Sequence, residues 1–186
     1  MIGLTTGRQT SQRLNSLLKE LANTIPDSRI IRRGKSSLDG LTARFLEEGV
    51  SHAMVLYRWH GGPGRIDFFK VDSTGLSQMA PSLLISRVRL RREYPHRERH
   101  TAQGISCERD SSAGTKTLWQ RLSEVLELPR VESITDAKIA ATIHVSEKTG
   151  GSIDVAVTSP PGICEVGPTL TIMKLLWDLD DSKKKA

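Results

Sequence analysis

The sequence has few aromatic residues, two cysteines and no long apolar run. Aromatic side chains make up only 4% of the 186 residues, which disfavours a protein that reads single-stranded RNA by base stacking. Cys107 and Cys164 lie 57 positions apart, with no CxxC pair and no Cys/His spacing for zinc. We therefore expect reduced, mostly buried thiols. No stretch approaches the roughly 18 apolar residues of a membrane helix, and the N-terminus lacks the apolar core of a signal peptide. A cytoplasmic protein without a membrane partner is expected.

The sequence also lacks a recognisable catalytic or metal-binding set. His96 and His100 flank Glu98 at a spacing that suits a metal pair on a helix. Pro95 and the neighbouring arginines instead predict a basic loop. No Ser/His/Asp or Cys/His combination emerges from the spacing of the other residues. We therefore predict no catalytic residues, no metal site, no cofactor and no small-molecule substrate.

Positive charge is concentrated in the first half. Residues 1–100 contain 17 Lys and Arg against 9 Asp and Glu, a net charge of +8, and 14 of these cations are arginines. Residues 101–186 contain 10 against 12, a net charge of −2. The arginine guanidinium matches phosphate oxygens in a bidentate way. A basic face indicates nucleic acid or an anionic membrane as partner, and a surface kept basic for solubility is the alternative.

Apolar periodicity predicts alternating strands and helices, the α/β class. Residues 2–6 read as a strand, and Thr10 or Ser11 can cap a helix with leucines at positions 14, 17, 18 and 21. Further strands are expected at 29–31, 52–60, 65–71, 81–92, 104–107, 139–147, 152–158 and 167–177, and helices at 36–48 and 115–126. The glycine-rich Gly61–Gly64 reads as a hairpin turn rather than a phosphate cradle.

The chain repeats itself at a shift of 87 residues. Eight identities fall in one ungapped block, among them Gly64 with Gly151, Asp67 with Asp154 and Pro81 with Pro168. This pattern predicts two similar tandem halves, each a small mixed sheet backed by helices. The segment 30–50 has no counterpart in the second half.

Three groups of cations are candidate phosphate ligands. Arg8 and Arg13 flank the start of the first helix, where free N–H groups and the helix dipole favour anions. Arg29, Arg32, Arg33 and Lys35 form a dense basic cluster. Arg87, Arg89 and Arg91 alternate along a strand and would share one face. Ordinary turns, a solvated loop and protection of a strand edge by charge are the respective alternatives.

Arg65, beside the hairpin turn, is a weaker candidate for phosphate contact. Tyr57 and Trp59 share a strand face with Val55, so both are expected in the core rather than on a stacking surface.

Three segments together resemble Brix-domain proteins. The opening TTGRQTSQRLNSLLKELANTIPDSRIIRRGKSSLDGL is similar to the start of that family, RWHGGPGRIDFFKV to its hairpin, and EVGPTLTIMKLLW to its closing Gly-Pro-Arg strand. The short length resembles archaeal members. Gly7 and Thr169 depart from the serine and arginine that the family often has, so one phosphate contact is expected to be missing from the last strand.

The resemblance implies a single Brix domain over residues 1–180, with a basic half 1–98, a C-terminal half 99–180 and a tail 181–186. It implies halves similar to the anticodon-binding domain of class II aminoacyl-tRNA synthetases. The implied function is ribosome biogenesis without catalysis, in which the chain binds structured precursor rRNA and assists its folding, processing and assembly. Ribosomal or assembly proteins are candidate partners of the C-terminal half. A protein-interaction scaffold with weak RNA contact is the alternative, and an RNA-processing enzyme is a more distant one.

Overall fold

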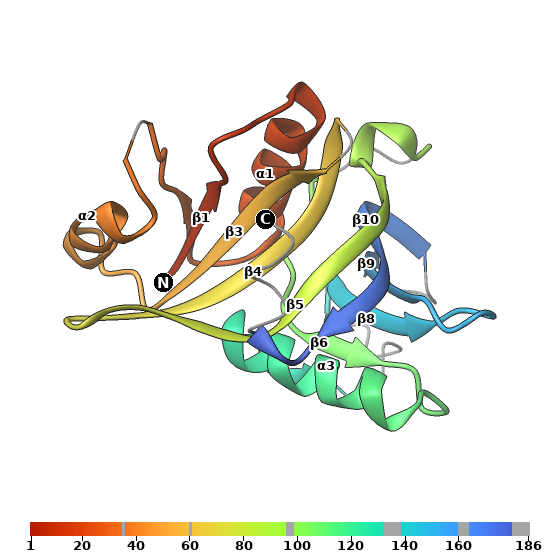
Figure 1. The fold of residues 1–186 in the computed structure, drawn as a ribbon. Coiled ribbons are helices and arrows are strands. Elements are labelled where there is room, and N and C mark those ends of the chain that lie inside the picture. The colour runs from red at the N-terminus through yellow and green to blue at the C-terminus, as the bar shows by residue number, and fades with distance from the viewer. Residues whose placement is uncertain (35, 60, 96–98, 132–138, 160–163, 180–186) are drawn as a thin grey trace. The chain divides into compact units, whose positions relative to one another are not determined.

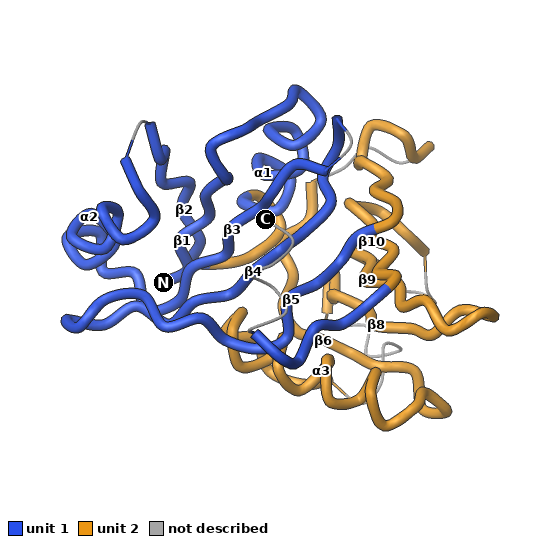
Figure 2. Tube along the Cα trace, viewed as in Figure 1, with its two compact units in different colours: residues 1–22, 27–85, 174–186 blue, residues 23–26, 86–173 orange. Residues whose placement is uncertain are grey.

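The chain folds into two compact α/β units in a computed structural model that describes residues 1–34, 36–59, 61–95, 99–131, 139–159 and 164–179. Unit 1 comprises residues 1–22, 27–85 and 174–186, and unit 2 comprises residues 23–26 and 86–173 (Figure 2). Each unit contains parallel and antiparallel strand pairs together with helices, so the predicted α/β class is confirmed.

Unit 1 has the strand order β2-β1-β3-β4-β5 (Figure 1). Strand β1 lies between β2 and β3 and is parallel to both, whereas β4 is antiparallel to β3 and β5 is antiparallel to β4. The strands are β1 (Ile2–Thr6), β2 (Ser28–Ile30), β3 (His52–Trp59), β4 (Gly62–Asp72) and β5 (Gly75–Arg89), and the helices are α1 (Gln12–Thr24) and α2 (Thr42–Glu47), the latter preceded by a 3-10 turn, Asp39–Leu41.

Unit 2 has the order β10-β9-β8-β6-β7. Strand β6 is parallel to β7 and β8, while β9 is antiparallel to both β8 and β10. Its elements are a 3-10 turn (Arg91–Glu93), β6 (Ile105–Cys107), α3 (Ala113–Val125), β7 (Arg130–Val131), β8 (Thr142–Glu147), β9 (Ile153–Ser159) and β10 (Cys164–Leu176). The last residues of β5 also lie in this unit, where Ser86 donates a hydrogen bond to the Thr171 carbonyl of β10.

The sequence explains α1 directly. Ser11 Oγ accepts the Leu14 N–H at 3.2 Å, which satisfies one free donor of the first turn. Leu14, Leu17, Leu18 and Leu21 are buried, as their spacing predicts. Asp27 adopts a positive φ of 46° just beyond the helix, and the chain then enters β2.

The face of the unit 1 sheet that packs on α2 forms a hydrophobic cluster with that helix. Leu41 and Phe45 pack with Ala53 and Val55 of β3 and with Phe69 of β4. The predicted helix 36–48 is shorter than expected because Ser37 Oγ accepts the Gly40 N–H at 3.0 Å, so that helical structure starts only after Ser37.

Several other boundaries were predicted wrongly, among them the starts of the strands expected at 139–147 and 167–177, and the short strand at Arg130–Val131 was not predicted. The strand expected at 81–92 runs from Gly75 to Arg89, because the Glu93 carboxylate accepts the Leu90 N–H at 3.0 Å and closes a turn. The turn expected at Gly61–Gly64 is tighter, since β4 already begins at Gly62 and pairs with Trp59.

Candidate nucleic-acid interface

The three parallel strands of unit 1 end at the same edge of the sheet, and each brings arginine there. Arg8 follows β1, Arg32 and Arg33 follow β2, and Arg58 is the penultimate residue of β3. The register supports this alignment, because the Gly7 N–H donates to the Leu56 carbonyl. Together with Arg13 in the first turn of α1, we call Arg8, Arg13, Arg32, Arg33 and Arg58 the arginine edge.

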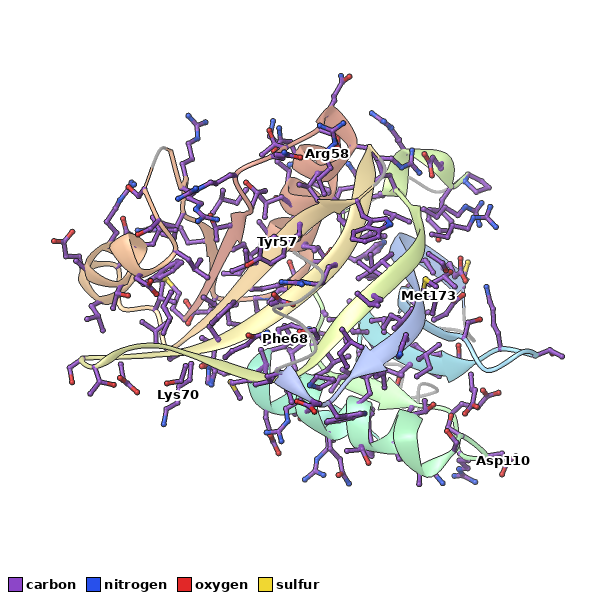
Figure 3. The ribbon with its side chains drawn as sticks, viewed as in Figure 1. Tyr57, Arg58, Phe68, Lys70, Asp110 and Met173 are labelled. Carbon is purple, nitrogen blue, oxygen red and sulfur yellow. The ribbon has the colours of Figure 1, made fainter. Side chains whose placement is uncertain are left out.

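Three of these arginines have no carboxylate partner among the described residues. Arg8, Arg32 and Arg58 are exposed and take part in none of the ion pairs of that part of the chain. Figure 3 shows Arg58 at the end of β3, beyond Tyr57 on the same strand. Neighbouring like charges without internal compensation favour a bound anion. The edge of parallel strands at their carboxyl ends is also where α/β sheets commonly bind ligands.

Tyr57 lies next to the arginine edge and explains why residue 7 is glycine. A Cβ on Gly7 would lie 2.7 Å from Tyr57 Cδ1, so the tyrosine ring occupies the space of a side chain. Burial raises the pKa of Tyr57, and the nearby charges of Arg65 and Arg33 oppose that rise. Arg33 itself donates from Nε to the Ser36 carbonyl at 2.9 Å, which orients the loop after β2.

Arg65 is committed to a contact inside the unit. Its Nη2 donates to Asp67 Oδ2 at 2.7 Å, and its guanidinium lies 4.6 Å from the centre of the Tyr57 ring. The Arg65 side chain is only 13% exposed, against 1% for Asp67. This position makes Arg65 a positioning residue for Tyr57 more than a surface cation.

Burial raises the pKa of Asp67, and Arg65 and Ser82 oppose the rise. Between the unfolded value near 3.9 and the raised folded value, the folded chain binds more protons than the unfolded chain. We therefore expect the free energy of unfolding of wild type, measured relative to Asp67→Asn, to fall as pH increases through that window. Denaturant titrations from about pH 3.5 to 7 test this. A relative stability that instead rises with pH would mean that the Arg65 charge outweighs burial.

The cations of the basic cluster predicted at residues 29–35 have different surroundings in the structure. Arg29 lies within β2 and forms an ion pair with Glu48, so it is partly neutralised. Arg32 lines a shallow hollow of about 270 Å³ with Arg44, which donates to the Arg32 carbonyl at 3.0 Å. Lys35 lies outside the described residues, as do His96 and Glu98.

The predicted arginine row belongs to unit 2 and is shorter than expected. Arg87 is exposed and Arg89 half-buried on β5, and Val88 between them is buried, as the alternation predicts. Arg91 lies in the 3-10 turn beyond the strand and does not continue the row. Arg89 stacks 3.8 Å from the centre of the Tyr94 ring and lies 3.7 Å from Glu165.

This part of unit 2 carries both signs of charge. Arg87 and Arg89 line a hollow of about 130 Å³ together with Lys148, Asp154 and Glu165. Lys148 forms an ion pair with Asp154 at 2.5 Å. Thr169, which stands where the resembling family often has arginine, is buried and shares a 2.6 Å hydrogen bond with Tyr94.

The carboxyl ends of the parallel strands in unit 2 carry both signs of charge, because Arg109 stands between Glu108 and Asp110 and Lys148 follows Glu147. Glu108 and Asp110 follow β6, and Glu147 ends β8. One Glu147 oxygen accepts the Ser112 N–H at 3.0 Å and the Thr115 hydroxyl at 3.1 Å, at the start of α3. These hydrogen bonds, the Ser112 backbone first, lower the pKa of Glu147. The anion-binding start of this helix is therefore occupied by the chain's own carboxylate.

Two predictions of burial were wrong. Trp59, expected in the core, is 54% exposed, because it is the last residue of β3 and extends past the part of the sheet that α2 covers. Cys164 is exposed at the first position of β10, whereas Cys107 is half-buried, and neither forms a disulfide. Arg58 and Arg44 were not among the sequence candidates, since only the pairing of distant strands brings them to this region.

The described residues show no cluster of metal-binding side chains and no helix that could span a membrane. Within them, no three His, Cys, Asp or Glu side chains gather in a group that could hold a metal ion. In the same part of the chain, the helices are too short and too polar to cross a lipid bilayer.

The fold is similar to those of two archaeal proteins of known structure. A crystal structure of a probable ribosomal biogenesis protein from Aeropyrum pernix superposes with a TM-score of 0.75 at 21% identity, over 94% of this chain and 98% of the other. Mil, an archaeal Imp4-like protein, superposes with a TM-score of 0.68 at 20% identity, over 96% and 100%. No protein-family model matches the chain.

Sequence relatives point the same way. A probable Brix domain-containing ribosomal biogenesis protein of Aeropyrum pernix is 30% identical over 90 residues, 48% of this chain and 50% of the relative. Proteins of the same description from Thermococcus kodakarensis and Pyrococcus horikoshii are 26% and 27% identical, over 52% and 50% of this chain and 46% and 41% of theirs. The predicted resemblance to archaeal Brix-domain proteins is confirmed. The chain matches about half the length of these curated relatives.

Proposed function

We propose that the chain is a non-enzymatic ribosome-biogenesis factor that binds structured precursor rRNA and assists its folding, processing and assembly in the cytoplasm. The arginine edge is the main support for this proposal, because the carboxyl ends of three parallel strands of unit 1 bring exposed arginines to the same edge of the sheet. The names of the archaeal relatives and of the solved structures support the setting in ribosome biogenesis.

Phosphate recognition follows from the kind and spacing of these groups. Arginine offers a planar set of donors that fits two phosphate oxygens. Arg8 and Arg58 follow adjacent parallel strands, which lie about 4.8 Å apart. The two guanidiniums can therefore reach one phosphate or two successive phosphates. Arg87 and Arg89 provide a second, weaker set in unit 2, because Glu165 partly neutralises Arg89.

Binding to rRNA fragments at several salt concentrations tests the proposal. Fluorescence anisotropy should show that the logarithm of affinity falls linearly with the logarithm of salt concentration, with a slope of about −0.7 to −0.9 per phosphate contact. Absence of measurable affinity near physiological salt would leave the protein-interaction scaffold. RNA cleavage that persists through purification and is lost on a single substitution would support an enzyme instead.

We also propose that residues 1–180 form one Brix domain of two related halves, each similar to the anticodon-binding domain of class II aminoacyl-tRNA synthetases. The eight identities at a shift of 87 support this, as does the matching succession of strand pairings in the two units. Ribosomal or assembly proteins are the proposed partners of the C-terminal half, since residues 101–186 carry a net charge of −2.

A further inference from the structure

Trp59 exposes a large aromatic side chain at the arginine edge. It is the last residue of β3 and directly follows Arg58. Its exposed fraction of 54% is high for an indole, which usually contributes its area to a core or an interface. A single exposed apolar residue is common on protein surfaces, so its neighbours must decide what it could bind.

The hairpin beneath Trp59 holds the indole in a defined position. β4 carries one extra residue, Gly64, between the pairs Tyr57–Arg65 and Arg58–Pro63. A Cβ on Gly64 would lie 2.0 Å from Trp59 Cβ and 3.0 Å from its Cγ. The tryptophan therefore rests directly on the glycine backbone, a close approach that no other residue type permits. This fixes the root of the side chain before any ligand binds.

The surroundings of Trp59 are cationic and aromatic together. Tyr57 lies two positions earlier on the same strand face, about 6.7 Å away along β3. The Arg65 guanidinium packs on the Tyr57 ring, and the Arg33 charge acts on the same tyrosine. Arg58 directly precedes Trp59 on β3, and Arg8 follows the neighbouring strand β1; both arginines are exposed. An exposed indole on a sheet edge that also carries exposed arginines suits a ligand that is flat, aromatic and anionic, which describes a nucleotide.

We propose that Trp59 stacks on an unpaired base of the RNA whose phosphates contact the arginine edge. This inference rests on the proposed function. It adds that the RNA segment bound by unit 1 contains a bulged or looped-out nucleotide. Phosphate contacts position an RNA but carry no information about pairing. Stacking on Trp59 supplies that information, because a base within a continuous duplex is not available to an indole.

Two RNAs provide the test: a continuous duplex, and the same duplex with one additional nucleotide that is bulged out of one strand. Wild type should bind the bulged RNA about 5- to 100-fold more tightly than the duplex, the range expected for one stacked base. Trp59→Ala should bind the two RNAs equally, whereas Trp59→Phe should keep part of the preference. The salt dependence should be the same in wild type and Trp59→Ala, because stacking releases no counterions.

Trp177→Ala is the matched control, since Trp177 is 41% exposed but lies beyond β10, beside Asp178. It should keep the preference for the bulged RNA. Quenching of tryptophan fluorescence on binding should be lost in Trp59→Phe and kept in Trp177→Ala. Thermal unfolding checks that each variant is folded.

The outcomes separate this inference from the proposed function. Equal binding of both RNAs by wild type, or an unchanged preference in Trp59→Ala, overturns the stacking role while RNA binding itself stands. A wild-type chain with no RNA affinity overturns both. In that case loss of a protein contact in Trp59→Ala would assign the indole to a protein interface.

Discussion

Replacing Arg32 and Arg33 together by alanine is expected to lower the affinity for a precursor-rRNA fragment roughly 100-fold at low salt. The estimate takes about 1.5 kcal/mol for each lost hydrogen bond to a charged group, the lower end of its range. The slope of log affinity against log salt should become shallower by about 1.4 to 1.8, the value for two phosphate contacts. Neither side chain is buried, so the fold should persist.

The control removes the same charge from a different surface. Lys116→Ala with Arg121→Ala deletes two cations from α3 of unit 2, where Arg121 pairs with Glu124 at 2.8 Å. This variant should bind RNA with a slope close to that of wild type. If both double variants weaken binding equally, net charge and not the arginine edge determines affinity. If neither does, the contacts lie elsewhere.

The largest effect on stability is expected from Phe45→Ala. Phe45 is fully buried among Leu41, Ala53 and Val55, and its ring fills the space left by Gly3, whose Cβ would lie 2.9 Å from Phe45 Cε1. Removing the ring leaves a cavity and should lower the free energy of unfolding by about 3–5 kcal/mol. Denaturant titration measures this change.

Leu46→Ala is the control for that change, because the neighbouring leucine is 42% exposed. Its effect should stay within about 0.5 kcal/mol. A small effect of Phe45→Ala would show that α2 is not part of the cooperative core. The segment 30–50, which the C-terminal half lacks, would then be an independent attachment to unit 1.

Local patterns predicted the parts of the fold that depend on neighbours in sequence. The leucine stripe and Ser11 predicted α1, and alternation predicted that Arg87 and Arg89 share a face. The end of β5 could not be found in this way. The strand pattern continues to Arg91, but the Leu90 N–H donates to the Glu93 carboxylate and the Glu93 N–H donates to the Leu90 carbonyl, which turns the chain out of the strand.

The candidate interface depends on contacts between distant segments. Alternation correctly put Trp59 on the same face as Val55, but it carries no information on how far α2 extends over that face. Arg58 was missed because its proximity to Arg8 requires the parallel pairing of β1 with β3, which are 45 or more residues apart. The large number of arginines in residues 1–100 was visible in the sequence, whereas their arrangement along one edge of the sheet was not.

The carboxylate of Glu147 at the start of α3 has a consequence for stoichiometry. An internal carboxylate already occupies the start of α3, and its hydrogen bonds from Ser112 and Thr115 lower its pKa. A chain with two equivalent basic edges could bridge two RNA segments and crosslink them at high concentration. Because Arg87 and Arg89 form only the weaker set of cations in unit 2, the proposed RNA binding is expected to saturate at one RNA per molecule in a titration at stoichiometric concentrations.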